Sequence, residues 1–190
     1  MRRSLLPALV LFAALALPGI GRANVPEVVV NVDDQQMIIL KDGQEVAKYK
    51  ISTSRFGLGD EMRSYKTPAG VLEVCDKSGE NLPVGAVIKG GKPTGEVLAP
   101  NAPGRDPIVT RVIRLKGLES QNCHARQRGI WIHGTVEEDR IGKPVSWGCI
   151  RMRSQDVVEL YKLVQVGTRV VIQTPKGHPG FLGWLGRMMS

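Results

Sequence analysis

The sequence has few aromatic residues. It contains three Phe, three Tyr and three Trp in 190 residues, beside 22 Gly and 12 Pro. Many turn-forming residues and little aromatic bulk favour a strand-rich chain over a helix bundle. Hydrophobic residues make up 42% and charged residues 23%, which is typical of a globular domain and excludes a collagen-like or disordered chain. The length has room for one domain or two very small ones.

The sequence also has few cysteines. Cys75, Cys123 and Cys149 include no C-x-x-C pair, which argues against a thiol-redox protein. An odd number leaves at least one thiol unpaired, and both a Cys75–Cys123 disulfide and the absence of any disulfide stay open. The adjacent Cys123 and His124 lack the ligand spacing of a zinc site. The sequence therefore predicts neither a metal ion nor another cofactor.

Acidic residues are outnumbered by basic ones. The chain has 26 Lys and Arg against 18 Asp and Glu, for a net charge of +8. This basicity suits an anionic partner. Because no nucleic-acid-binding motif is present, we expect an envelope polymer that carries carboxylates and not a nucleic acid.

A long apolar run occurs only near the N-terminus. Residues 5–20 are apolar, follow Arg2 and Arg3, and precede small residues at a cleavage point, an order typical of a secretory signal peptide. Two prolines interrupt the run, which is shorter than the roughly 20 residues that a membrane span needs. We therefore expect export to the periplasm or cell envelope, with three parts: a signal peptide (residues 1–23), one domain (24–175) and a C-terminal tail (176–190).

Period-two apolar alternation predicts strands along most of the domain. One amphipathic helix is expected at residues 155–165, with Ser154 as its N-cap and Gly167 after its end. Residues 81–107 are rich in Gly and Pro, and either a lid over a site or a plain surface insertion fits them. The expected strands are residues 28–32, 37–40, 46–51, 71–75, 84–89, 108–115, 129–133 and 168–173. The Asp42-Gly43 pair predicts a hairpin turn between the second and third of these strands.

His133 and Cys149 are the residues that point to chemistry. A cysteine nucleophile needs a base that lies near it in space, and a low thiol pKa would mark it as reactive. Gly148 permits a close backbone approach, and the N–H groups of Trp147, Gly148 and Cys149 are placed to stabilise an oxyanion. In an extended backbone Arg151 projects to the same side as Cys149. It is either a clamp for a substrate carboxylate or part of a structural ion pair.

The sequence resembles the L,D-transpeptidase catalytic domain family of the YkuD type. The resemblance rests on His133-Gly134-Thr135 and on Ser146-Trp147-Gly148-Cys149-Ile150-Arg151-Met152. Gln36 in the opening strands, the turn at residues 67–70 and residues 111–117 also match, so the resemblance covers nearly the whole predicted domain.

This resemblance implies a mainly β, sandwich-like domain with one helix after the catalytic cysteine. Cys149 would be the nucleophile, His133 the base and the Gly134 backbone the group that orients the imidazole. Trp147, Gly148 and Cys149 would form the oxyanion hole. Substrate contacts would come from Arg151, Trp147 and Ser146, although Ser146 also fits a turn residue.

The implied substrate is a peptidoglycan stem tetrapeptide. Cys149 would attack the bond between the third residue, a diamino acid, and the fourth, D-alanine, and form a thioester. Transfer to a second stem peptide gives a 3→3 crosslink, transfer to an envelope protein attaches that protein, and transfer to water makes the enzyme an L,D-carboxypeptidase. The family usually has histidine where this chain has Trp147, so a catalytically inactive peptidoglycan-binding domain is a further alternative.

Overall fold

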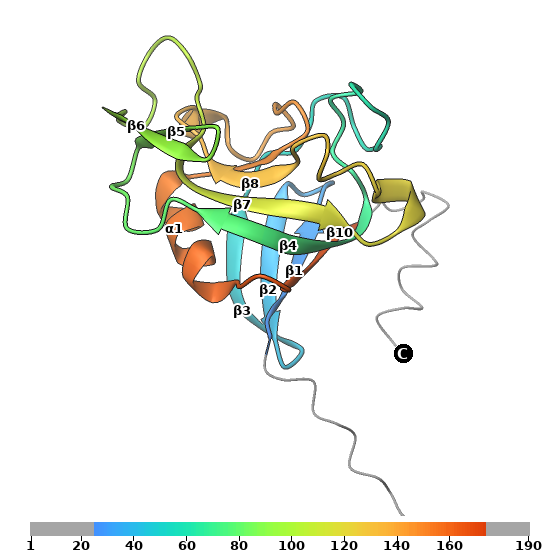
Figure 1. Cartoon of the computed structure of the whole chain (residues 1–190). Coiled ribbons are helices and arrows are strands. Elements are labelled where there is room, and N and C mark those ends of the chain that lie inside the picture. The colour runs from blue at the N-terminus through green and yellow to red at the C-terminus, as the bar shows by residue number, and fades with distance from the viewer. Residues whose placement is uncertain (1–24, 174–190) are drawn as a thin grey trace, which may run out of the picture.

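A computed structural model describes residues 25–173, which form a mainly β domain (Figure 1). Within this range there are ten strands and one α-helix, with two short 3-10 helices, so the predicted fold class is confirmed. The elements are β1 (Glu27–Asn31), β2 (Gln36–Lys41), β3 (Gln44–Lys50), β4 (Gly70–Ser78), β5 (Ala86–Lys89), β6 (Lys92–Val97), β7 (Val109–Gly117), η1 (Ser120–Asn122), β8 (Trp131–Gly134), η2 (Glu138–Arg140), β9 (Ile150–Met152), α1 (Ser154–Leu163) and β10 (Arg169–Gln173).

The strands form one bent sheet that folds into two layers. The strand order is β3-β2-β1-β10-β4-β7-β5-β6, and β8 pairs with both β7 and β9. In Figure 1, β4, β7 and β8 cross in front of β1, β2 and β3. Most neighbours are antiparallel, but β1 pairs with β10 and β8 pairs with β9 in parallel. The parallel β8–β9 pair carries the residues of the candidate site.

The hydrophobic core fills the space between the layers. Helix α1 packs against β7 and β8 and contributes Val157 and Leu160, which are fully buried. Each fully buried aliphatic side chain contributes about 1.5–3 kcal/mol relative to exposure. The largest fully buried side chains include Met37, Ile39, Ile51, Leu72, Ile113, Leu115, Ile132, Ile150 and Met152. Strands β8 and β9 are therefore held in place by core side chains of their own, Ile132, Ile150 and Met152.

The first hairpin forms as its sequence predicts. Asp42 and Gly43 join β2 to β3, and their φ angles are 53° and 76°, the positive values that a two-residue hairpin turn requires. Strand β3 pairs only with β2 and is therefore an edge strand of the described sheet. It carries the exposed residues Lys48 and Lys50. Charges on an edge oppose pairing with a second molecule.

The predicted limits of the helix are wrong by one to two residues. Ser154 is the first helical residue, and Arg153 occupies the N-cap position without a side-chain cap. The N–H of Ser154 donates instead to a carboxylate oxygen of Glu138 at 2.8 Å. The helix ends at Leu163 because Val164 is extended, with φ −106° and ψ 149°. A carboxylate from η2 therefore caps the helix in place of the predicted serine side chain.

The Gly- and Pro-rich segment at residues 81–107 contains a hairpin. Strand β5 overlaps the predicted strand, whereas β6 was not predicted because it is exposed throughout and has no apolar alternation. The hairpin joins the sheet through the pairing of Val87 with Val109. At the end of the segment, Asp106 accepts a hydrogen bond from the Thr135 hydroxyl at 2.6 Å. The segment is thus anchored through β5 of its hairpin and again near its C-terminal end at Asp106.

Cys75, Cys123 and Cys149 are all free thiols, so the structure contains no Cys75–Cys123 disulfide. No helix among residues 25–173 is long and apolar enough to span a membrane. The predicted signal peptide (1–23) and C-terminal tail (176–190) lie outside the described residues.

Candidate active site

Strands β8 and β9 bring the two predicted catalytic residues into one site. His133 on β8 pairs in register with Arg151 on β9, and Cys149 precedes β9 by one residue. Paired positions of neighbouring strands share a face of the sheet. Burial is the main influence on the pKa of both His133 and Cys149, and the positive charge of Arg151 acts on both groups as well.

His133 is a buried, neutral imidazole. Its side-chain Nδ1 lies 2.8 Å from the carbonyl oxygen of Gly134. Because a carbonyl oxygen only accepts, Nδ1 carries the proton and Nε2 has the free lone pair. Burial lowers the pKa of His133 from 6.5 to about 4, the Gly134 hydrogen bond opposes this shift, and Arg151 adds to it. Near neutral pH the imidazole is therefore able to accept a proton.

The Cys149 thiol is also neutral. Its Sγ donates to the carbonyl oxygen of Gly129 at 3.3 Å. Burial raises the pKa of Cys149, and a backbone hydrogen bond and the charges of Arg151 and Arg128 only partly oppose this effect. The pKa of the Cys149 thiol is therefore shifted upward, opposite to the low value expected from the sequence. Formation of a thiolate requires transfer of the proton as the nucleophile attacks.

Ser146 shapes the turn that holds Cys149. The Ser146 side chain is buried, and its hydroxyl donates to the Cys149 carbonyl oxygen at 2.5 Å. It also accepts the Gly148 N–H at 3.3 Å. Gly148 has a φ of 117°, a conformation that favours glycine. Ser146 thus acts as the turn residue that the sequence left as an alternative, and Trp147 and Cys149 supply the turn's other N–H groups.

Thr67 supports the same turn from a distant part of the chain. Its hydroxyl donates to the Gly148 carbonyl oxygen at 3.0 Å and accepts the Ser54 N–H at 3.0 Å. The side chain is fully buried. Sequence analysis singled out residues 67–70 as a turn, but it did not identify this contact. The only signal was that the same turn matches the family pattern.

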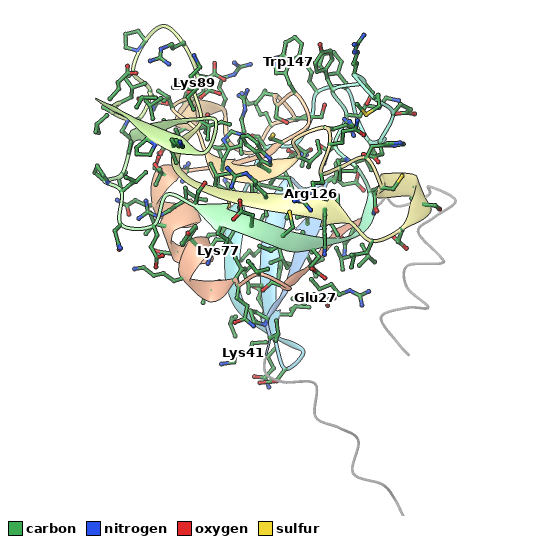
Figure 2. The ribbon with its side chains drawn as sticks, in the orientation of Figure 1. Glu27, Lys41, Lys77, Lys89, Arg126 and Trp147 are labelled. Carbon is green, nitrogen blue, oxygen red and sulfur yellow. The ribbon has the colours of Figure 1, made fainter. Side chains whose placement is uncertain are left out.

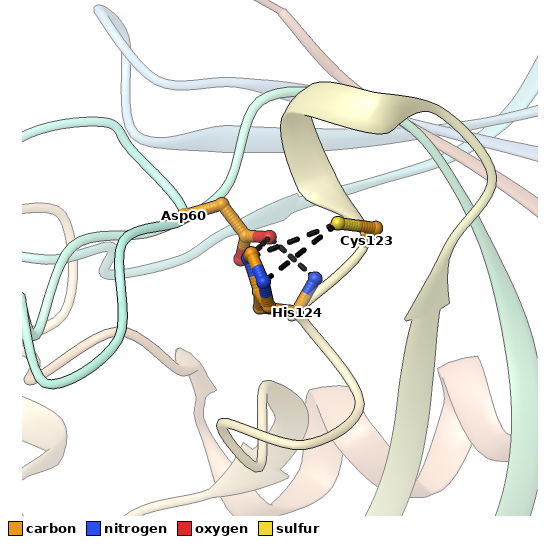
Figure 3. A group of neighbouring side chains, drawn as sticks. All are labelled: Asp60, Cys123 and His124. Atoms are coloured by element: carbon orange, nitrogen blue, oxygen red, sulfur yellow. Dashed lines mark hydrogen bonds and ion pairs between the residues drawn. The ribbon is translucent and has the colours of Figure 1, made fainter.

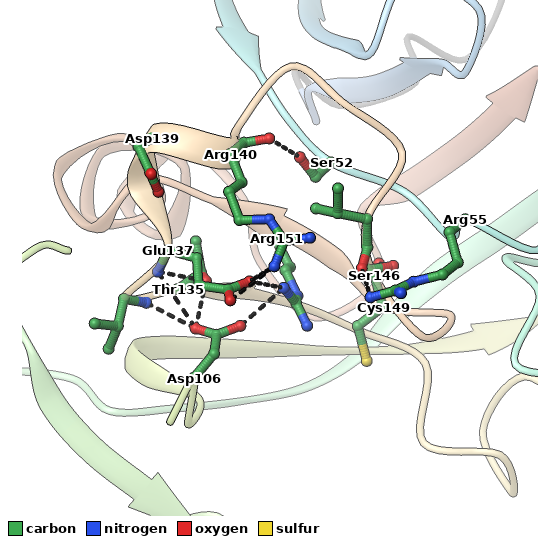
Figure 4. A network of polar contacts seen from close by, with 12 residues as sticks. Ser52, Arg55, Asp106, Thr135, Glu137, Asp139, Arg140, Ser146, Cys149 and Arg151 are labelled. Atoms are coloured by element: carbon green, nitrogen blue, oxygen red, sulfur yellow. Dashed lines mark hydrogen bonds and ion pairs between the residues drawn. The ribbon is translucent and has the colours of Figure 1, made fainter. Parts of the chain in front are cut away.

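Arg151 lies in a network of acidic residues (Figure 4). Its guanidinium is 2.8 Å from a carboxylate oxygen of Asp106 and 3.0 Å from one of Glu137. The Arg151 side chain is only 13% exposed. The structure thus places Arg151 in the ion pair that was the alternative to a substrate clamp. Neither acidic partner had a sequence signal, because each is separated from Arg151 by a loop of irregular composition.

Three exposed aromatic residues form a rim beside the thiol. Trp147 is 54% exposed and projects from the surface (Figure 2). Its ring centroid lies 5.3 Å from that of Phe56 and 5.2 Å from that of Tyr65, both edge-on. The Arg55 guanidinium lies 5.2 Å from the Trp147 ring centroid. We call Phe56, Tyr65 and Trp147 the aromatic rim.

Two hollows adjoin the 129–131 stretch of the chain. The first, of about 270 Å³, is lined by Met62, Arg63, Tyr65, Arg128, Gly129, Ile130 and Trp147. Its lining includes Gly129, whose carbonyl oxygen accepts from the Cys149 thiol, but not Cys149 itself. The second, of about 640 Å³, is lined by residues that include Trp131, Val87 and Arg105. The site therefore offers separate spaces next to one short segment.

Arg128 holds the wall of the first hollow. Its side chain is 5% exposed and forms an ion pair of 2.8 Å with Asp60. It also donates to the carbonyl oxygens of Gly59 and Lys66, at 3.0 and 2.6 Å. A single arginine thus fixes both ends of the segment that carries Tyr65. Sequence analysis did not identify this role.

Within residues 25–173, one group of His, Cys and Asp side chains is close enough to hold a metal ion. It consists of Asp60, Cys123 and His124 (Figure 3). It includes neither Cys149 nor His133.

Comparison with known proteins agrees with the fold and the motif. The model of the YkuD family, the L,D-transpeptidase catalytic domain, matches residues 26–172. The chain is 32% identical over 147 residues to "Putative L,D-transpeptidase YqjB" of Bacillus subtilis, which covers 77% of this chain and 70% of that protein. It is 32% identical over 155 residues to "Probable L,D-transpeptidase YcfS" of Escherichia coli, which covers 78% of this chain and 44% of that protein.

Solved structures share the fold. An L,D-transpeptidase from Mycobacterium smegmatis matches with a TM-score of 0.52 and 18% identity, over 78% of this chain and 58% of that one. The chain thus spans less than two thirds of that structure and less than half of the E. coli relative. The match of one family model to most of the chain, together with these relatives, shows that the protein belongs to the L,D-transpeptidase catalytic domain family.

Proposed function

We propose that this protein is a cysteine acyltransferase that acts on peptidoglycan stem tetrapeptides in the cell envelope. Cys149 is the nucleophile, His133 the base, and the scissile bond joins the third residue, a diamino acid, to D-alanine. The observation that carries the proposal is the pairing of β8 with β9, which sets His133 beside Arg151, two residues after Cys149. Nδ1 of His133 is bound to the Gly134 carbonyl, which leaves the lone pair of Nε2 to accept a proton. The apolar N-terminal segment supports export to the envelope.

The first half-reaction forms a thioester. Cys149 Sγ attacks the carbonyl carbon of the third residue as its proton moves to Nε2 of His133. The N–H groups of Trp147 and Cys149 receive the developing oxyanion, because the Gly148 N–H is already donated to Ser146. Collapse of the tetrahedral intermediate breaks the C–N bond, and the imidazolium returns its proton to the amine of the departing D-alanine. His133 is then neutral again.

The second half-reaction transfers the acyl group. An acceptor amine attacks the thioester carbonyl and gives its proton to His133, and the C–S bond breaks as the thiol takes that proton back. An amine on a second stem peptide yields a 3→3 crosslink, and an amine on an envelope protein yields an attached protein. Water in the same position yields a tripeptide with a free carboxylate.

The first hollow is the proposed donor site. Its lining includes Gly129, which holds the Cys149 thiol, and exposed Arg63, which offers a cation for a stem carboxylate. The aromatic rim covers apolar parts of the donor, with Trp147 stacking on the peptide or sugar. Because Arg151 is bound to Asp106 and Glu137, we assign it a positioning role and not direct carboxylate binding.

The test is incubation of the purified protein with disaccharide-tetrapeptide, followed by mass spectrometry of products and of the intact protein. We expect a Cys149 thioester lighter than the sum of protein and substrate by one D-alanine, and then a crosslinked dimer that lacks one D-alanine. Cys149→Ala is the matched control and must abolish both species. Cys75→Ser, which changes a thiol outside the site, must leave both unchanged.

The other outcomes separate the alternatives. Tripeptide without dimer would identify an L,D-carboxypeptidase. Binding to purified peptidoglycan without thioester or turnover would contradict the proposal in favour of an inactive wall-binding domain, with Trp147 as the first residue to replace by His.

A further inference from the structure

Asp60, Cys123 and His124 form a polar cluster that the proposed reaction does not use. Cys123 and His124 follow η1, and Asp60 comes from the segment before β4 (Figure 3). Asp60 is buried, whereas the other two side chains are exposed. One ligand atom from each residue lies within 4.8 Å of the others. Thiolate, imidazole and carboxylate together are the donor set of borderline-soft divalent cations such as Zn²⁺.

The distances between ligand atoms fit tetrahedral coordination. Cys123 Sγ lies 3.7 Å from Nδ1 of His124, and that Nδ1 lies 3.4 Å from Oδ2 of Asp60. Tetrahedral zinc, with Zn–S near 2.3 Å and Zn–N and Zn–O near 2.0–2.1 Å, sets these separations at about 3.6 and about 3.3 Å. Two of the three separations therefore match those of a bound ion, and the third, between Sγ of Cys123 and the Asp60 carboxylate, is within 4.8 Å.

Asp60 is held in place for this role by its surroundings. Its Oδ1 accepts from Arg128 at 2.8 Å, and its Oδ2 accepts the backbone N–H of His124 at 2.6 Å. Each carboxylate oxygen has two lone pairs, so Oδ2 retains one for a cation. Hydrogen bonds of this kind orient the ligands of metal sites. Arg128 partly neutralises the negative charge of Asp60. The Cys123 thiolate therefore supplies the further negative charge that a divalent cation needs.

We propose that Asp60, Cys123 and His124 form a zinc-class metal site with an open fourth position. Zn²⁺ binds Sγ of Cys123, Nδ1 of His124 and Oδ2 of Asp60, and water completes the tetrahedron. Binding of the ion to the Cys123 sulfur displaces the thiol proton, which is released to solvent. The proposal is independent of the proposed function, because it includes neither Cys149 nor His133.

The ion would cross-link two parts of the wall around the first hollow. Asp60 begins the segment that carries Met62, Arg63 and Tyr65, and Cys123 and His124 lead to Arg128 and Gly129. At present hydrogen bonds and the Asp60–Arg128 ion pair join these two segments. A bound ion adds coordinate bonds between them, so we expect slower hydrogen exchange at residues 59–67 when the metal is present.

The experiment measures Zn²⁺ binding to the purified full chain that carries Cys149→Ala, which removes the competing active-site thiol. Competition with a chromogenic zinc indicator gives the affinity, and Co²⁺ substitution reports a thiolate ligand through near-ultraviolet charge-transfer absorption. We expect one equivalent bound and a higher melting temperature with metal. Cys123→Ser and His124→Ala should each weaken binding by at least about 100-fold, since even outer-shell changes cost 10–100-fold.

Cys75→Ser is the matched control, because it removes a free thiol outside the cluster. Melting curves without metal verify that each variant is folded, which we expect because both varied ligands are exposed. The proposal is overturned if the indicator retains all the zinc, if Cys123→Ser and His124→Ala bind as tightly as their parent, or if Cys75→Ser weakens binding equally.

Discussion

The hydroxyl of Thr67 donates a hydrogen bond to the carbonyl oxygen of Gly148, which lies 81 residues later in the chain. The same hydroxyl oxygen accepts the N–H of Ser54. One buried side chain therefore links the segment before β4 to the turn that carries the nucleophile. The position of Cys149 depends on this contact as much as on its own neighbours in sequence.

Thr67→Val should weaken both folding and acylation. Valine keeps the shape but leaves the Ser54 N–H and the Gly148 carbonyl without their partner, which costs about 1–3 kcal/mol for each buried group. Urea unfolding measures the loss of stability, and intact-mass kinetics measure acylation of Cys149. Thr67→Ser, which keeps the hydroxyl, should retain most of both. Equal stability of Thr67→Val and wild type would contradict this role.

His133→Ala should slow thioester formation by about 10²–10⁴-fold, the usual contribution of a general base. In the wild type the acylation rate should fall as pH drops through about 4, where His133 becomes protonated. Single-turnover mass spectrometry across a pH series measures both effects. If acylation of Cys149 continued at an undiminished rate in His133→Ala, the assignment of the base would be wrong.

The stability of the fold should decrease in acid because of the same histidine. The pKa of His133 is about 4 when folded and 6.5 ordinarily, so between these values the unfolded chain binds more protons. Folding stability therefore rises with pH across this window, by about 3 kcal/mol in total. Urea unfolding at several pH values measures the slope. His133→Asn, which does not titrate, should lack this component, and an unchanged slope in that variant would exclude His133 as its source.

Arg151→Gln should destabilise the protein more than it weakens substrate binding. Removing one partner of a buried ion pair leaves an uncompensated charge and costs about 3–5 kcal/mol. Here that charge is on Asp106, because Glu137 keeps its ion pair with Arg140. A double-mutant cycle with Asp106→Asn in urea unfolding measures the coupling. A large rise in KM with unchanged stability would instead support the substrate clamp.

Trp147→Ala should raise KM for the tetrapeptide and change kcat little. The exposed ring contacts Phe56 and Tyr65, and its backbone N–H, which we place in the oxyanion hole, is retained in the variant. Steady-state kinetics separate KM from kcat. Phe56→Ala, which removes another ring of the aromatic rim, should act in the same direction. A loss confined to kcat would contradict a binding role for the rim.

The sequence predicted those features that depend on local pattern. The turn at Asp42 and Gly43 followed from two residues that tolerate positive φ, and the buried strands followed from apolar alternation. The fold class and the family followed from a motif whose residues are close together in sequence. The pairing of His133 with Arg151 required the register of β8 and β9, and β9 has only three residues.

The remaining features depend on contacts between distant segments. Glu138 caps the helix in place of the Ser154 side chain because η2 lies beside its first turn. Asp106 reaches Arg151 from a Gly- and Pro-rich segment with no regular pattern. The thiol pKa was mispredicted because burial outweighs the nearby positive charges. Burial of one atom is a property of the whole fold and has no signature in a short motif.

The parallel pairing of β1 with β10 joins the two ends of the described domain. Val28 lies beside Val170, about 140 residues later, and contacts of such long sequence separation form slowly. Strand β10 also lies between β1 and β4 and pairs with both, so these two strands are joined in the sheet only when β10 is in place. A chain that lacks β10 therefore cannot complete the sheet, so the N-terminal strand β1 reaches its final hydrogen-bonding partners only after residues 169–173 are present.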